Sequence, residues 1–209
     1  RLVGCRLSVA AELDESAAFA ESRLKSLTGS DTITARFLHK EYFDFAPTHK
    51  FWISGNHKPA IKGTDMGIWR RIRLIPFTVT IPEENKDKHL AEKLKAEMPG
   101  ILNWAIAGCL RWQSEGLRVP SCVKIATEDY RAAEDVVGQF INEATMADGE
   151  TTNADLYAHY LTWCDKNGIR SRLQKSKFND RIEERGEYEK CRRSSGFIWR
   201  GISTVPLQW

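Results

Sequence analysis

The chain has 209 residues, of which 42% are hydrophobic and 28% are charged, and its formal net charge is +3. This length can bury one full hydrophobic core or two smaller ones, and no apolar run approaches the roughly 20 residues that a membrane span needs. The five cysteines lie far apart and form no Cys-x-x-Cys pair, which argues against a disulfide framework or a zinc site and favours a reducing cytoplasm.

Charge is distributed unevenly along the chain. Residues 128–165 contain nine Asp/Glu and one Lys/Arg, whereas residues 166–200 contain 11 Lys/Arg and five Asp/Glu. The basic block suggests a nucleic-acid partner, and the simpler alternative is a solvated surface that happens to be positive. The chain also begins at Arg1 in an apolar segment without a methionine, so we expect it to be a piece of a longer protein.

Residues 1–82 predict alternating strands and helices. RLSVAA (6–11) has the length of a strand, and residues 15–29 have helical composition and stop at Gly29. Residues 32–47 predict a β-hairpin with the charged tip HKE, and KFWISGN (50–56) and RIRLIPFTV (71–79) predict two more strands. The pattern indicates an α/β sheet with an inserted hairpin.

Residues 83–147 predict a helical segment. Apolar residues recur at helical spacing in 85–98 and in 99–116, and the second run lies between Pro99 and Gly116. A further helix is expected from Pro120 or Ser121 through the acidic stretch to Ala144. Residues 145–153 (TMADGETTN) are short and polar, so we expect them to be a linker.

Residues 148–209 predict a helix–helix–hairpin module. The helices are expected at 153–168 and 174–186, and two strands at 187–202 surround a Ser-Ser-Gly turn. A basic second helix followed by a basic hairpin is the layout of a winged helix, a DNA-binding module. The cations expected to contact DNA phosphates are Lys175, Lys177, Arg181, Arg192 and Arg193.

Three polar positions suit the chemistry of a P-loop ATPase. Such an enzyme needs an acid for Mg²⁺ and water, a polar sensor on the next strand, and a cation for the transferred phosphoryl group. Glu12 follows one strand and suits the acid, Asn56 ends another and suits the sensor, and Arg70 or Arg71 suits the cation. Taken singly, an asparagine such as Asn56 is more often a turn residue, and paired arginines are more often surface charges, while Glu12 can simply begin the following helix.

The order of these segments resembles the C-terminal half of a superfamily 3 helicase domain, as in phage and plasmid primase-helicases and, more distantly, poxvirus primase-helicases. RLSVAAELDE resembles the Walker B strand, FWISGN resembles motif C, and GIWRRIRLIPF resembles the arginine-finger segment. LKSLTGSDTITARFLHKEYFDFAP resembles the segment specific to this superfamily. The resemblance implies a P-loop, AAA+-like core (residues 1–82, partial), a helical segment (83–147) and a winged-helix domain (148–209).

The resemblance also implies residue roles and partners. Glu12, with Glu15 as a second candidate, would be the Walker B acid that holds Mg²⁺, and Asn56 would be the sensor. Arg71, with Arg70 second, would be the finger that reaches a neighbouring subunit of a ring, expected to be hexameric. His39 and Lys40 at the hairpin tip would contact DNA in the ring channel, unless they form only a charged, solvated hairpin end.

One motif of the family is missing from this sequence. No stretch matches Gly-x-x-x-x-Gly-Lys-Ser/Thr, the loop that cradles phosphates. The family likeness therefore implies that the cradle lies upstream, where a primase domain is also possible, and that this piece alone neither binds ATP tightly nor hydrolyses it. It further implies single- and double-stranded DNA as partners, a bacterial host cytoplasm, and a phage, prophage or plasmid origin.

Two other classes of protein are compatible with parts of the sequence. A DNA-binding regulator or origin-binding module without motor activity would explain the C-terminal module, but not the arrangement of Asn56 and Arg71. A nuclease or other metal enzyme would need clustered ligands, and the five histidines show no ligand spacing. A Walker A motif upstream would favour the motor.

Overall fold

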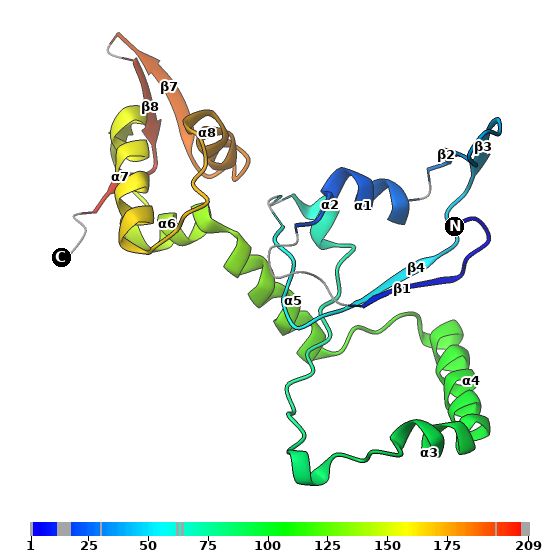
Figure 1. Ribbon diagram of the computed structural model, residues 1–209. Helices are drawn as coiled ribbons and strands as arrows, with labels where there is room; N and C mark the ends of the chain where they lie inside the picture. Colours follow the sequence, from blue (N-terminus) through cyan, green and yellow to red (C-terminus); the bar gives the residue numbers. More distant parts are fainter. Residues whose placement is uncertain are drawn as a thin grey trace. The chain divides into compact units, whose positions relative to one another are not determined.

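The computed structural model describes residues 2–11, 18–29, 31–61, 63, 65–194 and 196–205 (Figure 1). It is a mixed α/β structure that divides into two compact units. The first comprises Arg1–Ile72 together with Tyr130–Trp209, and the second comprises Arg73–Asp129. Glu12 and Glu15, the candidates for the Walker B acid, lie outside the described residues.

The N-terminal part of the first unit contains a parallel strand pair. β1 (Leu7–Ala11) pairs with β4 (Lys50–Ser54) in a register that runs from Leu7 opposite Lys50 to Ala11 opposite Ser54. Parallel strands require a crossover connection, and the intervening chain holds the helix α1 (Glu21–Thr28). The two predicted strands and the α/β character are thus confirmed, while α1 begins six residues after the predicted start.

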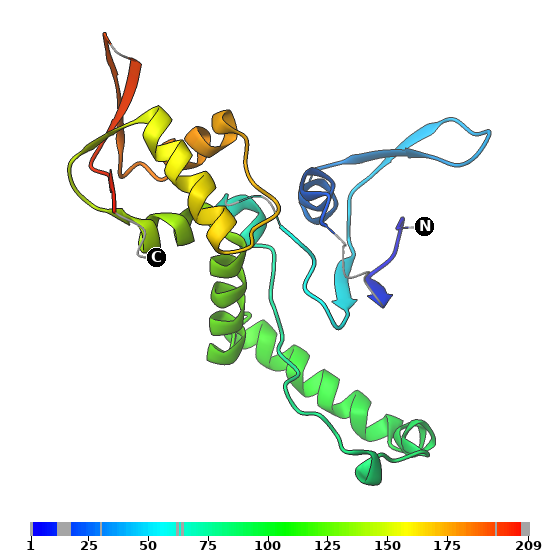
Figure 2. The same cartoon turned by 60° about the vertical axis from the view of Figure 1, so that its left-hand side comes forward.

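The predicted hairpin is also present. β2 (Ile33–Arg36) and β3 (Tyr42–Phe45) pair antiparallel, with Ile33 opposite Phe45 and Arg36 opposite Tyr42. In both views the hairpin extends away from α1 (Figures 1 and 2). The short helix α2 (Met66–Trp69) follows β4 and leads to the two arginines.

One strand prediction is wrong. RIRLIPFTV (71–79) contains no strand, although its apolar residues Ile75, Phe77 and Val79 alternate with Pro76 and Thr78. The side chains of Phe77 and Val79 are 93% and 85% exposed. A strand needs a neighbour for its backbone hydrogen bonds, and no described segment pairs with this one.

The second unit is helical. It contains a 3₁₀ turn (Glu83–Asn85), α3 (Leu90–Ala96), α4 (Met98–Glu115) and the first part of α5 (Ser121–Glu134). Gly116 ends α4 with a φ of 73°, a backbone conformation that favours glycine. Large apolar side chains of α4 remain exposed, including Trp104 and Trp112.

The long helix predicted up to Ala144 is broken in two. α5 ends at Glu134, and α6 (Val136–Ala144) starts after Asp135. The carboxylate of Asp135 accepts a hydrogen bond from the Gly138 amide, so it caps α6 and favours a new helix start. The predicted linker is wrong in part, because it contains β5 (Thr145–Met146) and β6 (Glu150–Thr152).

Residues 135–194 and 196–205 form a C-terminal module around one core. Its helices are α6, α7 (Asn153–Lys166) and α8 (Lys175–Glu183). β7 (Glu189–Arg193) and β8 (Gly196–Arg200) form a hairpin that β6 extends in the order β6-β8-β7, and β9 (Ser203–Thr204) pairs with β5. Helices and sheet bury one cluster of large side chains, which includes Phe140, Leu156, Tyr160, Phe178 and Trp199.

Candidate functional site

The ends of β1 and β4 mark the predicted nucleotide edge. Because the strands are parallel and Ala11 pairs with Ser54, the carboxyl ends of β1 and β4 lie at the same edge of the sheet. Open α/β sheets bind ligands at the carboxyl ends of their strands. Asn56 follows β4 by two residues and is exposed, so its amide is accessible to a ligand at this edge.

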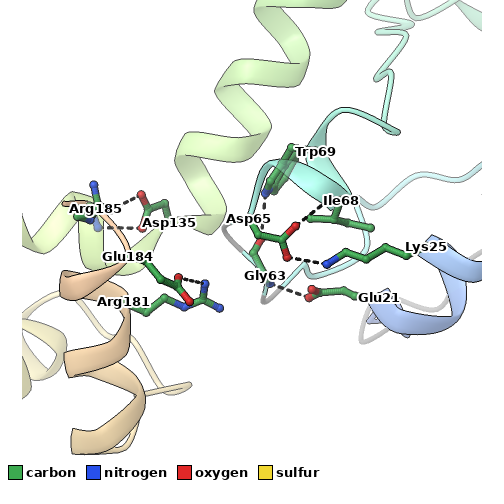
Figure 3. A network of polar contacts seen from close by, with 11 residues as sticks. Glu21, Lys25, Gly63, Asp65, Ile68, Trp69, Asp135, Arg181, Glu184 and Arg185 are labelled. Atoms are coloured by element: carbon green, nitrogen blue, oxygen red, sulfur yellow. Dashed lines mark hydrogen bonds and ion pairs between the residues drawn. The ribbon is translucent and has the colours of Figure 1, made fainter. Parts of the chain in front are cut away.

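Polar contacts from α1 hold the segment that carries the arginines (Figure 3). Lys25 Nζ lies 2.6 Å from a carboxylate oxygen of Asp65, and the Gly63 amide donates to the Glu21 carboxylate at 2.6 Å. Asp65 also accepts from the Ile68 amide at 3.2 Å and so caps α2. The hydrogen bond and charge of Lys25 lower the pKa of Asp65, which stays ionised as cap and ion-pair partner.

Arg70 and Arg71 follow α2 directly and have different surroundings. Arg70 is exposed, whereas Arg71 is half-buried. The Arg71 guanidinium donates to the Gly67 carbonyl oxygen, and its buried Nε has no hydrogen-bond partner among the described residues. The Arg71 side chain therefore helps to hold α2 in this structure, and the Arg70 side chain is the more exposed of the two.

The tip of the β2–β3 hairpin presents both predicted DNA contacts. His39 and Lys40 are exposed, and His39 has a φ of 58°, a left-handed conformation that a tight turn requires. The Lys40 amide donates to the Phe37 carbonyl oxygen at 3.1 Å and closes the turn. Leu38 is 85% exposed beside them, so the tip is apolar as well as basic, a feature that charge patterning did not predict.

The predicted cations of the C-terminal module have three kinds of surroundings. Arg181 forms an ion pair with Glu184 at 3.0 Å, and Arg193 forms one with Glu150 at 2.7 Å. Lys175 lies over the ring of Tyr157, with Nζ 5.9 Å from the centroid. Among the described residues, no carboxylate pairs with the other two, which are Lys177 and Arg192.

Residues that the sequence did not single out contact the loop between Asn56 and Arg70. Tyr130 and Glu134 of α5 both hydrogen-bond to its backbone. The sequence shows that these two residues are four positions apart on a predicted helix. This spacing does not identify a loop contact, because an amphipathic helix has the same spacing when it only packs against a core. Within the described ranges, no group of three or more His, Cys, Asp or Glu could hold a metal ion.

Comparison with known proteins identifies viral helicases as relatives. A family model described as "Poxvirus D5 protein-like" matches residues 133–200, which cover most of the C-terminal module. The protein named "Putative helicase L207/L206" of Acanthamoeba polyphaga mimivirus is 32% identical over 165 residues, 69% of this chain and 17% of the relative. "Putative helicase 022R" of Frog virus 3 is 28% identical over 196 residues, 83% of this chain and 20% of the relative.

Residues 133–200 are thus similar to the poxvirus D5-like family, and larger parts of the chain are similar to viral proteins named putative helicases. The chain spans about a fifth of the length of the relatives that it matches. They come from viruses of eukaryotes, as does a third relative, "Putative helicase 184R" of Invertebrate iridescent virus 6, so the expected phage or plasmid origin and bacterial host are not supported. No helix among the described residues is both long and apolar enough to cross a membrane.

Proposed function

We propose that this chain is the C-terminal part of an ATP-dependent DNA helicase of the superfamily 3, primase-helicase kind. The parallel pairing of β1 with β4 carries the proposal, because it sets the ends of RLSVAA and KFWISG at one sheet edge. Asn56 is the sensor at this edge. Glu12, with Glu15 second, is the acid, and the phosphate cradle comes from an upstream segment of the protein.

The proposed site uses ATP and Mg²⁺. A bound Mg²⁺ neutralises charge on the phosphates, and the exposed amide of Asn56 can donate to a phosphate oxygen or accept from the attacking water. The finger, Arg71 or Arg70, acts on a neighbouring subunit of a hexameric ring. A guanidinium suits this role because it stays charged and grips phosphate oxygens in a fork.

DNA contacts are proposed for two separate surfaces. His39 and Lys40 at the hairpin tip contact single-stranded DNA in the ring, and exposed Leu38 beside them adds apolar surface. The C-terminal module, as a winged helix, contacts duplex phosphates through α8 and the β7–β8 hairpin. Support comes from Lys177 and Arg192, which are exposed and have no carboxylate partner among the described residues.

ATP hydrolysis by the full-length protein, with and without single-stranded DNA, tests the proposal. Asn56→Ala should reduce the rate by at least about a hundredfold, the typical effect of losing one group that positions or stabilises the reacting atoms. Asn85→Ala removes an exposed asparagine of the 3₁₀ turn and should leave the rate unchanged. If Asn56→Ala hydrolyses ATP at the wild-type rate, this asparagine is a turn residue and the sensor assignment fails.

The same preparation separates the motor from the simpler DNA-binding alternative. A protein that binds DNA in a salt-dependent manner but hydrolyses no ATP would favour a regulator or origin-binding module. Lys40→Ala provides a finer test, because it should leave basal ATP hydrolysis intact and reduce unwinding. If both activities fall together, the hairpin has a structural role instead.

A further inference from the structure

The last turn of α5 binds the backbone of the loop that follows Asn56. The Tyr130 hydroxyl donates to the Pro59 carbonyl oxygen, and the Glu134 carboxylate accepts from the Ile61 amide at 2.8 Å. Tyr130 is 3% exposed and Ile61 is 1% exposed, so both hydrogen bonds are partly shielded from water. Tyr130 and Glu134 both face the loop because they are four positions apart on the same helix.

Tyr130 also contacts the far end of the same loop. Its ring meets the Trp69 ring edge-on, with the centroids 5.2 Å apart and the planes at 85°. The Trp69 indole N–H donates to the Gly63 carbonyl oxygen at 2.9 Å, which joins the loop before α2 to the last residue of this helix. Trp69 directly precedes Arg70, so one buried tyrosine touches the segment at Pro59 and immediately before the arginines.

The protonation state of Tyr130 favours this role. Burial and the nearby negative charge of Glu134 raise the pKa of Tyr130 far above that of a free tyrosine. The hydroxyl therefore keeps its proton and remains a donor to Pro59. The aromatic ring lies under Lys58, whose Nζ is 5.4 Å from the centroid.

We propose that Tyr130 and Glu134 are positioning residues that fix residues 58–61 and 65–72 and thereby aim the arginine that acts in phosphoryl transfer. The structural part stands on these contacts alone, and the catalytic part rests on the proposed ATPase function. α1 holds the same segment through Glu21 and Lys25, as described above. The arginines are thus set by two helices, and Asp135, directly after Glu134, begins the C-terminal module.

Amide hydrogen exchange in the full-length protein tests the structural part. Tyr130→Phe removes only the hydroxyl, and Glu134→Ala removes the acceptor for Ile61 together with the carboxylate charge. Both should accelerate exchange in peptides covering residues 57–72. Tyr157→Phe is the matched control, because it removes a hydroxyl that donates to the Leu173 carbonyl oxygen at 3.1 Å inside the C-terminal module, and it should leave those peptides unchanged. Unchanged exchange in both test variants would overturn the proposal.

Steady-state kinetics with ATP test the catalytic part. A displaced finger weakens only the transition state, so kcat should fall about 10- to 100-fold in Glu134→Ala while KM stays near the wild-type value. Glu134→Gln retains an oxygen that can accept from Ile61 and should recover most of the lost rate. Wild-type kinetics in Glu134→Ala would overturn the catalytic part. If the wild-type protein hydrolyses no ATP, the proposed function fails, whereas the exchange experiment still decides whether the loop is held.

Discussion

Arg70 and Arg71 show how neighbouring residues of one type can differ in their surroundings. Arg71 uses its guanidinium on the Gly67 carbonyl oxygen, and Arg70 is exposed. The order of motifs favours Arg71 as the finger. If Arg71 is the finger, its guanidinium must release the Gly67 carbonyl oxygen before it can contact the phosphate in a neighbouring subunit.

Mixing inactive variants tests whether Arg71 acts between subunits. Arg71→Ala and Glu12→Gln should each assemble and be nearly inactive, because loss of an arginine finger costs about 10³- to 10⁵-fold in rate. In a mixture, some interfaces combine an intact Glu12 with an intact Arg71, and ATP hydrolysis should partly recover. Arg118→Ala serves as a surface control. If mixed rings form and stay inactive, Arg71 does not act across the interface, and Arg70 becomes the candidate.

Asp65 should make stability depend on pH in the acid range. Its pKa is lowered in the folded state, mainly by the hydrogen bond from Lys25, and is about 3.9 in an unfolded chain. The stabilisation is therefore fully present above about pH 4 and lost as the pH falls through the lowered value. Because the Asp65 side chain is half exposed, solvent screening keeps the effect small.

Asp65→Asn keeps an oxygen that can cap α2 but removes the charge. The urea midpoint of this variant should decline less steeply than that of the wild type between pH 5 and pH 2. Equal slopes for both proteins would show that the Lys25–Asp65 pair adds no measurable stability.

At the scale of elements, the β7–β8 hairpin offers a matched pair of arginines. Arg193 is paired with Glu150, whereas Arg192 is exposed without a carboxylate partner among the described residues. Each phosphate contact contributes about 0.9 to the slope of log affinity against log salt. Arg192→Ala should reduce this slope for duplex DNA by about one contact, and Arg193→Ala should reduce it less, as measured by fluorescence anisotropy at several salt concentrations. If the salt dependence of DNA affinity in Arg192→Ala has the same slope as in the wild type, this hairpin does not contact DNA phosphates.

The C-terminal module depends on its aromatic core. Phe178 of α8 is fully buried, and its ring centroid lies 4.6 Å from that of Tyr160 and 5.9 Å from that of Phe140. Phe178→Ala should lower the free energy of unfolding of the module by about 3–5 kcal/mol, as measured by urea denaturation. Phe197→Ala changes a side chain that is 47% exposed and should cost much less. Similar losses in both variants would contradict the assignment of this core.

At the scale of the whole molecule, the exposed apolar surfaces are large in both units. Leu7, Val9 and Trp52 of the parallel pair are 55%, 65% and 56% exposed, and Trp104 of α4 is 74% exposed. Parallel strands are ordinarily covered on both faces. Such exposure is consistent with relatives that are about five times longer than this chain.

The sequence alone determined most element types and the order of the candidate motifs. Hydrophobic periodicity, Gly29, Gly116 and the Ser-Ser-Gly turn are local signals, and they predicted α1, α4 and the two hairpins. The motif order also predicted a relation to primase-helicases, which the viral relatives support. The roles of Asn56 and of the arginines stay predictions, because no described contact tests them.

Only the tertiary structure decided which segments meet. The pairing of β1 with β4 joins residues that are 43 positions apart, and the hydrogen bond from Tyr130 to Pro59 joins residues that are 71 positions apart. No local pattern specifies such partners. The same reason explains the failed strand at 71–79, because its alternation is correct but a strand also needs a neighbour. Helical periodicity continues through Asp135 and so does not predict the break there. The Asp135 side chain caps α6 and pairs with Arg185, 50 positions further along the chain.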